Sequence, residues 1–271
     1  MLHYDFMRRA LLAAVLIGFA APAVGTYLVQ RKLALIGDGM GHIALTGVAL
    51  ALLTGTAPVG MALVTAATGA VVIELVRARG RTSGDVALAI LFYGGIAGGV
   101  VLINKAPAST PANLTQYLFG AITTTTAGDL AVFAILTTLV LGVTIGLSRE
   151  LFAISHDEEY AAASGLPVLG LNLLLAVMTA VTVVVSMRVV GLLLISALMV
   201  VPVATATILS RSFRGTLALS VAIGVAVAVG GVALSFQADT PSGGTIVLLA
   251  ITLFALASAG SALRRSRLAR G

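Results

Sequence analysis

The chain has no cysteine and no tryptophan, and only 10% of its 271 residues are charged. Without cysteine, disulfides and thiolate metal ligands are excluded. So few charges cannot cover the surface of water-soluble domains of this total length, which excludes a soluble protein. Ten acidic residues and three histidines remain. Any metal site in this chain must therefore be built from carboxylates and imidazoles.

Enzyme signatures are also absent. The sequence contains no HExxH, no GxSxG and no P-loop, which are the patterns of zinc proteases, serine hydrolases and many ATPases. We therefore expect no enzyme activity and no bound cofactor in this chain, and any ATP hydrolysis must come from a separate subunit. The net charge of +6 indicates basic loops beside a membrane and not a nucleic-acid partner.

Apolar residues dominate what is present, at 59% of the chain, with a mean hydropathy of +1.11. Apolar runs of about 18–21 residues recur, long enough to cross a hydrocarbon core of roughly 30 Å as helices. They predict an all-α polytopic membrane protein with eight or nine spans, because the joint at 187–190 is short, in one domain over residues 1–271. The runs are 10–29, 34–54, 57–76, 86–104, 130–148, 169–187, 190–209, 217–235 and 245–262.

The basic residues predict the orientation of these spans. Most of them lie in the loops at 31–32, 77–81, 149, 211–214 and 264–270, and alternation through nine spans brings these loops to one side. The positive-inside tendency makes that side cytoplasmic and the N-terminus external. Arg8 and Arg9 then lie outside, against the same tendency.

Two polar stretches differ from ordinary loops. Residues 105–129 are too polar to span and are expected as a surface or re-entrant segment on the outer side. In the other stretch, Ser155 and Glu158 have the spacing of a capping box, and Gly165 with Pro167 forms a stop signal. A helix of about 156–164 is therefore predicted on the cytoplasmic side. It is either a capped surface helix or a docking helix for a soluble partner.

Asp38 and His42 are the ionisable pair inside an apolar run. Four residues apart, they share one face of a helix, and an ionised aspartate near a helix centre costs roughly 3 kcal/mol. A carboxylate oxygen and an imidazole nitrogen suit zinc, manganese or iron. Two ligands make a poor site, but a two-fold axis beside the helix would double them. The alternative is structural: Asp38 hydrates at the cytoplasmic end, and His42 bonds a neighbouring helix.

The other ionisable residues have simpler interpretations. Glu74 lies three residues before Arg77 and is expected to pair with it. His156 belongs to the polar helix and is expected to be solvated. Asp239 lies in the sequence DTPSGG, which is typical of a turn.

Four segments resemble the membrane permease subunits of zinc and manganese ABC importers, in the same order over about residues 7–262: LIGDGMGHIALTGVALALL, YLFGAITTTTAGDL, HDEEYAAASGLPVLGLNLLL and DTPSGGTIVLLA. The resemblance implies a homodimeric permease in a prokaryotic cell membrane, surrounded by lipid. It also implies two cytoplasmic ATP-binding subunits and an extracytoplasmic solute-binding protein that delivers the metal.

The resemblance also assigns residues. It places Asp38 and His42 on the translocation path as a transient metal site. It makes the segment around 156–164 the coupling helix, in which the residues that contact the ATP-binding subunit are Asp157, Glu158, Glu159, Ala162 and Gly165. The chain departs from many relatives in having Gly-Met-Gly between the acid and the histidine, where they have Ala and Ser. This difference is not expected to alter ligation.

The leading hypothesis is therefore the channel subunit of an ATP-driven importer of divalent metal, with zinc favoured by the imidazole and manganese or iron as alternatives. A gradient-driven secondary transporter is a second class. It needs no docking helix and usually shows internal repeats, which are not visible here. An intramembrane hydrolase lacks a nucleophile and base.

Overall fold

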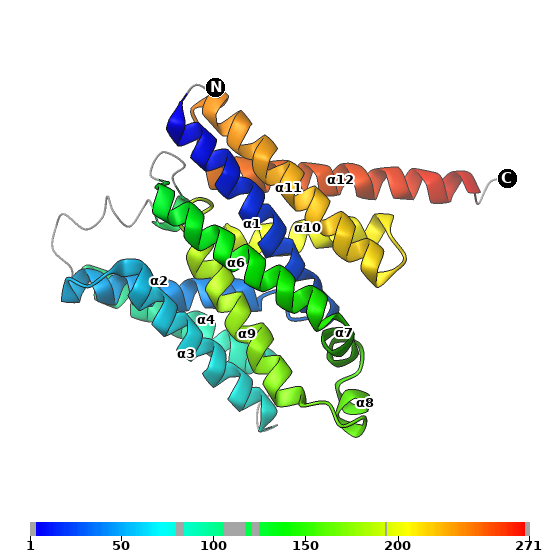
Figure 1. The fold of residues 1–271 in the computed structure, drawn as a ribbon, viewed down its shortest axis with the longest axis horizontal. Coiled ribbons are helices and arrows are strands. Elements are labelled where there is room, and N and C mark those ends of the chain that lie inside the picture. Colours follow the sequence, from blue (N-terminus) through cyan, green and yellow to red (C-terminus); the bar gives the residue numbers. More distant parts are fainter. Residues whose placement is uncertain (1–3, 80–83, 106–116, 121–124, 193, 269–271) are drawn as a thin grey trace.

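In a computed structural model, the protein is described except for residues 1–3, 80–83, 106–116, 121–124, 193 and 269–271 (Figure 1). The described part of the chain contains helices and no strands, as the apolar runs predicted. The helices are α1 (Asp5–Gln30), α2 (Ile36–Thr54), α3 (Pro58–Ala78), α4 (Gly84–Asn104), α6 (Ala127–Gly146), α7 (Ser148–His156), α8 (Glu158–Ala163), α9 (Val168–Ser186), α10 (Ile195–Leu209), α11 (Phe213–Ala238) and α12 (Ser242–Leu268).

Eight of the described helices are long and apolar enough to cross a membrane, and α10 is the short exception. With 15 residues, α10 is about 22 Å long, less than the roughly 30 Å of a hydrocarbon core. The sequence placed a full-length span at 190–209. Instead, the chain turns at Gly191, whose φ of +93° suits glycine, and α10 begins only at Ile195.

Helix α1 is the most enclosed span and packs against α6, α10 and α11. It approaches α11 closely at Gly18, where an added Cβ would lie 2.7 Å from the Cα of Val225. Such contacts explain why glycine and alanine are frequent in these runs, since small residues let helices associate closely in lipid.

Helix α2 packs between α3 and α4. A Cβ at Gly95 of α4 would lie 2.8 Å from the carbonyl carbon of His42, and a Cβ at Gly47 would lie 2.7 Å from the Cα of Ala62 on α3. The Thr46 hydroxyl donates to the Gly95 carbonyl at 2.7 Å. The mean hydropathy of α2 is 1.5, the lowest of the eight candidate spans. Close packing on both sides therefore fixes the helix that carries Asp38 and His42.

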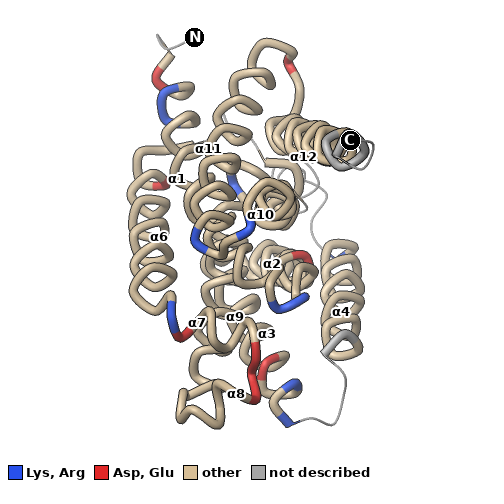
Figure 2. Tube along the Cα trace, turned by 90° about the vertical axis from the view of Figure 1, so that its right-hand side faces the viewer, with Lys and Arg blue, Asp and Glu red and all other residues tan. Residues whose placement is uncertain are grey.

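Several helix ends meet at two separate places. At one of them, which we call the coupling end, three aromatic rings meet. The ring centroid of Phe213, at the start of α11, lies 5.3 Å from that of Tyr27 on α1 and 4.8 Å from that of Phe152 on α7. At the other, Asp129 of α6 pairs with Arg188 after α9. Figure 2 shows charged segments around α3, α7 and α8 and long uncharged stretches along most helices. Arg31, after α1, and Arg77, near the end of α3, both reach Glu158 of α8 at the coupling end.

Candidate functional site

Asp38 lies in the first turn of α2, and its carboxylate has one hydrogen-bond donor in the described chain. The donor is the Ser196 hydroxyl of α10, at 3.3 Å. Asp38 borders a cavity of about 270 Å³ that is otherwise lined by Leu35 and by the α4 residues Leu88, Ala89, Phe92 and Tyr93. Asp38 is therefore the charged group in an otherwise apolar or aromatic lining.

His42 lies one turn further along α2 and is partly buried. Its ring meets Phe92 of α4 edge-on, with centroids 4.5 Å apart. Its Nδ1 is buried and has no hydrogen-bond partner among the described residues. An unpaired buried polar atom of this kind costs about 1–3 kcal/mol, so it is expected where a site binds a ligand. The hydrogen bond to a neighbouring helix that the structural alternative requires is not made by this nitrogen.

Asp38 and His42 are not joined by a third candidate metal ligand among the described residues. No group of three or more histidine, aspartate or glutamate side chains that could hold a metal ion occurs in the part of the chain that the structure describes. Asp38 and His42 thus stand as two candidate ligands on one helix face, as the sequence predicted. A complete site needs ligands from elsewhere, since tetrahedral protein sites commonly use three or four.

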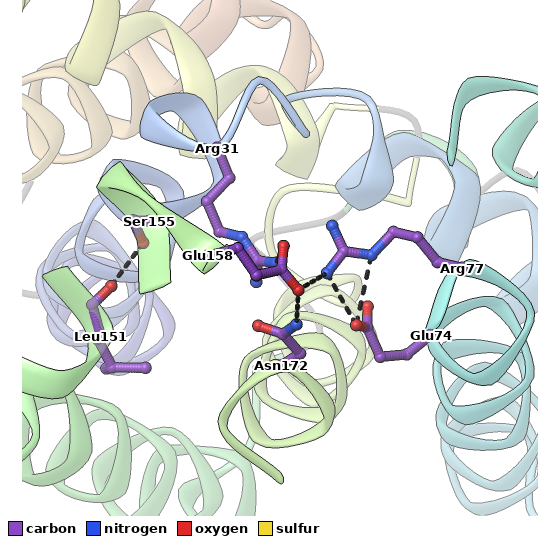
Figure 3. Close-up of polar contacts among 7 residues, drawn as sticks. All are labelled: Arg31, Glu74, Arg77, Leu151, Ser155, Glu158 and Asn172. Carbon is purple, nitrogen blue, oxygen red and sulfur yellow. Dashed lines mark hydrogen bonds and ion pairs between the residues drawn. The ribbon is translucent and has the colours of Figure 1, made fainter. Parts of the chain in front are cut away.

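The predicted polar helix is present in a shorter form, as α8. Its cap differs from the prediction: Asp157 is the N-cap, and its carboxylate accepts from the Tyr160 N–H at 2.9 Å. Ser155 instead belongs to α7 and donates to the Leu151 carbonyl at 2.6 Å (Figure 3). The capping box of Ser155 with Glu158 was therefore wrong, because the helix begins two residues later and Asp157 caps it at the Tyr160 N–H. Gly165 ends the helix with a φ of +81°, as predicted.

Glu158 turns back toward its own chain. Its carboxylate accepts from Arg31 at the end of α1 at 3.3 Å, from Arg77 of α3 at 3.3 Å and from the Asn172 amide of α9 at 2.7 Å. Arg77 also donates to Glu74 at 2.9 Å, which confirms the predicted pair. Figure 3 shows this Glu158 cluster, defined as these five residues. Its members link the end of α1 with α3, α8 and α9.

The members of the Glu158 cluster differ in burial, and Glu158, which contacts most of the others, is the most exposed. The side chains of Glu74 and Arg31 are only 3% and 4% exposed, whereas that of Glu158 is 44% exposed. Burial lowers the pKa of the Arg31 guanidinium, the neighbouring Arg77 charge lowers it further, and Glu158 and Glu74 oppose both effects. Sequence reasoning missed Arg31 and Asn172. The isolated amide in the apolar run 169–187 was the one signal available for Asn172.

Most of the other residues of α8 face outward. Glu159, Ala162 and Gly165 are exposed, as is Tyr160, while Ala161 is buried. His156 is exposed at the end of α7 and stacks on Phe152. Asp239 is the left-handed C-cap of α11, so its role in a turn is confirmed. The outer polar segment predicted at 105–129 lies mostly outside the described residues.

A family model, the ABC 3 transport family, matches residues 3–261. The chain belongs to this family. It is 34% identical over 257 residues to the "Manganese transport system membrane protein MntC" of Halalkalibacterium halodurans, covering 95% of this chain and 88% of that protein. It is 29% identical to a Haemophilus influenzae protein named "Probable iron transport system membrane protein", covering 97% of this chain and 96% of that protein.

A solved structure extends the likeness to three dimensions. PsaBC from Streptococcus pneumoniae in complex with Fab matches with a TM-score of 0.82 and 30% identity, over 94% of this chain and 91% of that one. With the family match and the eight candidate spans, this makes the chain a multi-pass membrane protein and a metal ABC transporter permease. The resemblance seen in the sequence is thereby confirmed.

Proposed function

We propose that this permease forms the path for a divalent metal in an importer whose ATP-binding subunits are separate chains. The observation that carries the proposal is the pairing of Asp38, which borders a cavity, with an unpartnered buried nitrogen of His42 one turn away. A divalent ion that leaves water needs replacement ligands, and this pair offers both charge and affinity.

Manganese is the metal we propose first, with iron second. Sequence reasoning favoured zinc because of the imidazole. The two named relatives are described as manganese and iron transport proteins, and mixed carboxylate and imidazole ligands accept either metal. An extracytoplasmic binding protein would deliver the ion, so selection for one metal need not reside in Asp38 and His42.

A second copy of the chain would complete the site. The most exposed spans are α4 and α12, whose apolar windows are 22% and 11% buried, against 72% for α1. The Asp38 cavity is lined on one side by α4, so a two-fold axis along α4 would bring two aspartates and two histidines toward each other. Such a homodimer is a common arrangement for membrane and soluble oligomers alike.

The coupling helix α8 would pass the movement of the ATP-binding subunits to the spans. Its exposed face, which includes Glu159 and Ala162, is free to contact a partner. Its Glu158 carboxylate is tied to α1, α3 and α9. A rigid displacement of α8 would therefore pull on three spans at once. Arg31 precedes α2 by only a few residues, which links this movement to Asp38.

The test is metal uptake by the assembled transporter with Asp38→Asn or His42→Ala. Each variant should abolish manganese uptake, because the first removes the charge and the second a nitrogen ligand. Expression and association with the ATP-binding subunit should persist. A matched control is Asp239→Asn, which makes the same change of residue type at an exposed position outside the proposed path. Normal uptake of manganese, iron and zinc by either site variant would make the pair structural.

A further inference from the structure

A separate cleft lies on the flank of the coupling end, where α6 passes into α7 and α11 begins. Its volume is about 750 Å³, within the range of ligand pockets. Its polar lining includes Arg149, Glu150 and Arg214, and its apolar lining includes Ile145 and Leu217. It shares no residue with the Asp38 cavity or the Glu158 cluster, and nothing in the proposed transport path explains it.

Two arginines of this cleft lack anionic partners. Arg149 and Arg214 are both exposed, and neither makes an ion pair or hydrogen bond with the rest of the described chain. Glu150 lines the same cleft without pairing with either guanidinium. The three side chains leave a net charge of +1, which suits a ligand of single negative charge. Guanidinium groups bind phosphate oxygens particularly well because their N–H donors match the geometry of the anion.

An exposed apolar stripe on α6 leads into the cleft. Val132, Ile135 and Leu139 are exposed along one face of the helix, at spacings of three and four residues. Gly142 and Gly146 continue that face, and a Cβ at either position would meet nothing within 4 Å. The stripe therefore ends in a shallow, open groove beside Ile145, which is 64% exposed.

The depth of the cleft matches the boundary between hydrocarbon and water. Gly146 is the last residue of the span α6, and Phe213 and Arg214 begin the span α11. The apolar stripe thus lies within the membrane, and the two arginines lie at its surface. Basic pockets between spans at this level are typical binding sites for anionic lipid headgroups.

We propose that this cleft binds one anionic phospholipid of the leaflet on the coupling side. The phosphate lies between Arg149 and Arg214, and an acyl chain follows the α6 groove past Gly146 and Gly142. A headgroup with hydroxyls, as in phosphatidylglycerol, also offers donors to Glu150, which a choline headgroup cannot do. Bound there, the lipid links the α6–α7 junction to α11 at the coupling end.

The experiment measures which lipids stay on the purified complex of permease and ATP-binding subunits. The complex is equilibrated with equal amounts of phosphatidylglycerol and phosphatidylcholine and analysed by native mass spectrometry. The double variant Arg149→Gln/Arg214→Gln should lower the retained ratio of phosphatidylglycerol to phosphatidylcholine about thirtyfold, since each guanidinium beside the bound phosphate is expected to contribute about fivefold. The control Arg79→Gln/Arg211→Gln removes two exposed arginines outside the cleft and should leave the ratio unchanged.

A second pair of variants tests the groove without altering charge. Gly146→Leu fills the cleft lining and should expel phosphatidylglycerol, whereas Gly142→Leu, one turn away and outside the lining, should weaken retention less. The proposal is overturned by equal retention of the two lipids in the wild-type complex, or by an equal loss in the arginine control. Displacement of the lipid by millimolar inorganic phosphate would assign a free-anion site instead. If Gly146→Leu instead dissociates the permease dimer, this face of α6 contacts a second copy of the chain and not a lipid.

Discussion

The two polar clusters of this permease differ in how far the chain itself satisfies them. In the Glu158 cluster, each carboxylate faces at least one guanidinium, and Glu158 receives three donors. In the α2 pair, Asp38 has one donor at 3.3 Å and the His42 Nδ1 has none among the described residues. We call the first cluster closed because its charges are all paired within the chain, although its Asn172 Oδ1 is buried without a partner among the described residues. We call the second pair open because Asp38 faces no cation in the described chain.

The contrast separates two uses of buried polarity. A closed cluster holds helix ends together, and removing one member leaves another charge uncompensated. An open pair contributes little to holding the helices together and is retained at a cost, which is typical of ionisable groups on an ion pathway. Damage to the Glu158 cluster should therefore appear first as lost stability or coupling. Damage to the α2 pair should appear as lost transport by a folded protein.

The largest effect is expected from Arg77→Ala. It leaves the Glu74 carboxylate, which is 3% exposed, without its cation, and breaking a buried pair in this way costs about 3–5 kcal/mol. The unfolding temperature of the purified protein in detergent should fall accordingly. Arg79→Ala, two residues on and exposed, should have almost no effect. The double variant Glu74→Gln/Arg77→Ala should recover much of the loss, and no recovery would show that Arg77 acts through Glu158 instead.

A smaller effect is expected from Glu158→Gln, which keeps the shape of the side chain but removes its charge. Hydrogen bonds to charged groups contribute about 1.5–3 kcal/mol, so the link from α8 to the spans should weaken by about tenfold or more. Metal imported per ATP hydrolysed should fall, while ATP hydrolysis continues. Glu159→Gln alters a neighbouring exposed carboxylate. An equal fall in that variant would place coupling in the outer face of α8 and not in the cluster.

The smallest effect is expected from Asp157→Ala, which removes the N-cap of α8. Loss of a cap costs about 1 kcal/mol, so hydrogen exchange at the Tyr160 N–H should accelerate about fivefold. Ser155→Ala should leave that exchange unchanged, because the Ser155 hydroxyl bonds within α7. Faster exchange in the Ser155 variant would show that Ser155 caps α8, as the sequence predicted.

The spans were predictable because their signal is local. A run of apolar residues must form a helix in lipid whatever its neighbours are, and the observed ends of α2, α3 and α9 lie within a few residues of the predicted ones. The short helix α10 was missed. Residues 190–194 are as apolar as the helix that follows them, so hydropathy cannot detect the turn at Gly191.

The candidate site was predictable only in part. Asp38 and His42 were found because they are polar residues in an apolar run, and their helical spacing needs no tertiary information. The contact of Ser196 with Asp38 joins residues 158 positions apart, and that of Arg31 with Glu158 joins residues 127 apart. No spacing rule reaches so far. Their pairing depends on how whole helices pack.

The composition of α2 also bears on how the protein is made. A helix enters the bilayer according to its own hydrophobicity, and α2, with Asp38, His42 and several glycines, is the span least able to partition into lipid alone. Its neighbours α3 and α4 are synthesised after it. During translation α2 must therefore wait beside α1 at the translocon, or enter provisionally, until those helices arrive to enclose it. The polar residues and glycines of α2 thus make the early steps of membrane insertion depend on the order of synthesis.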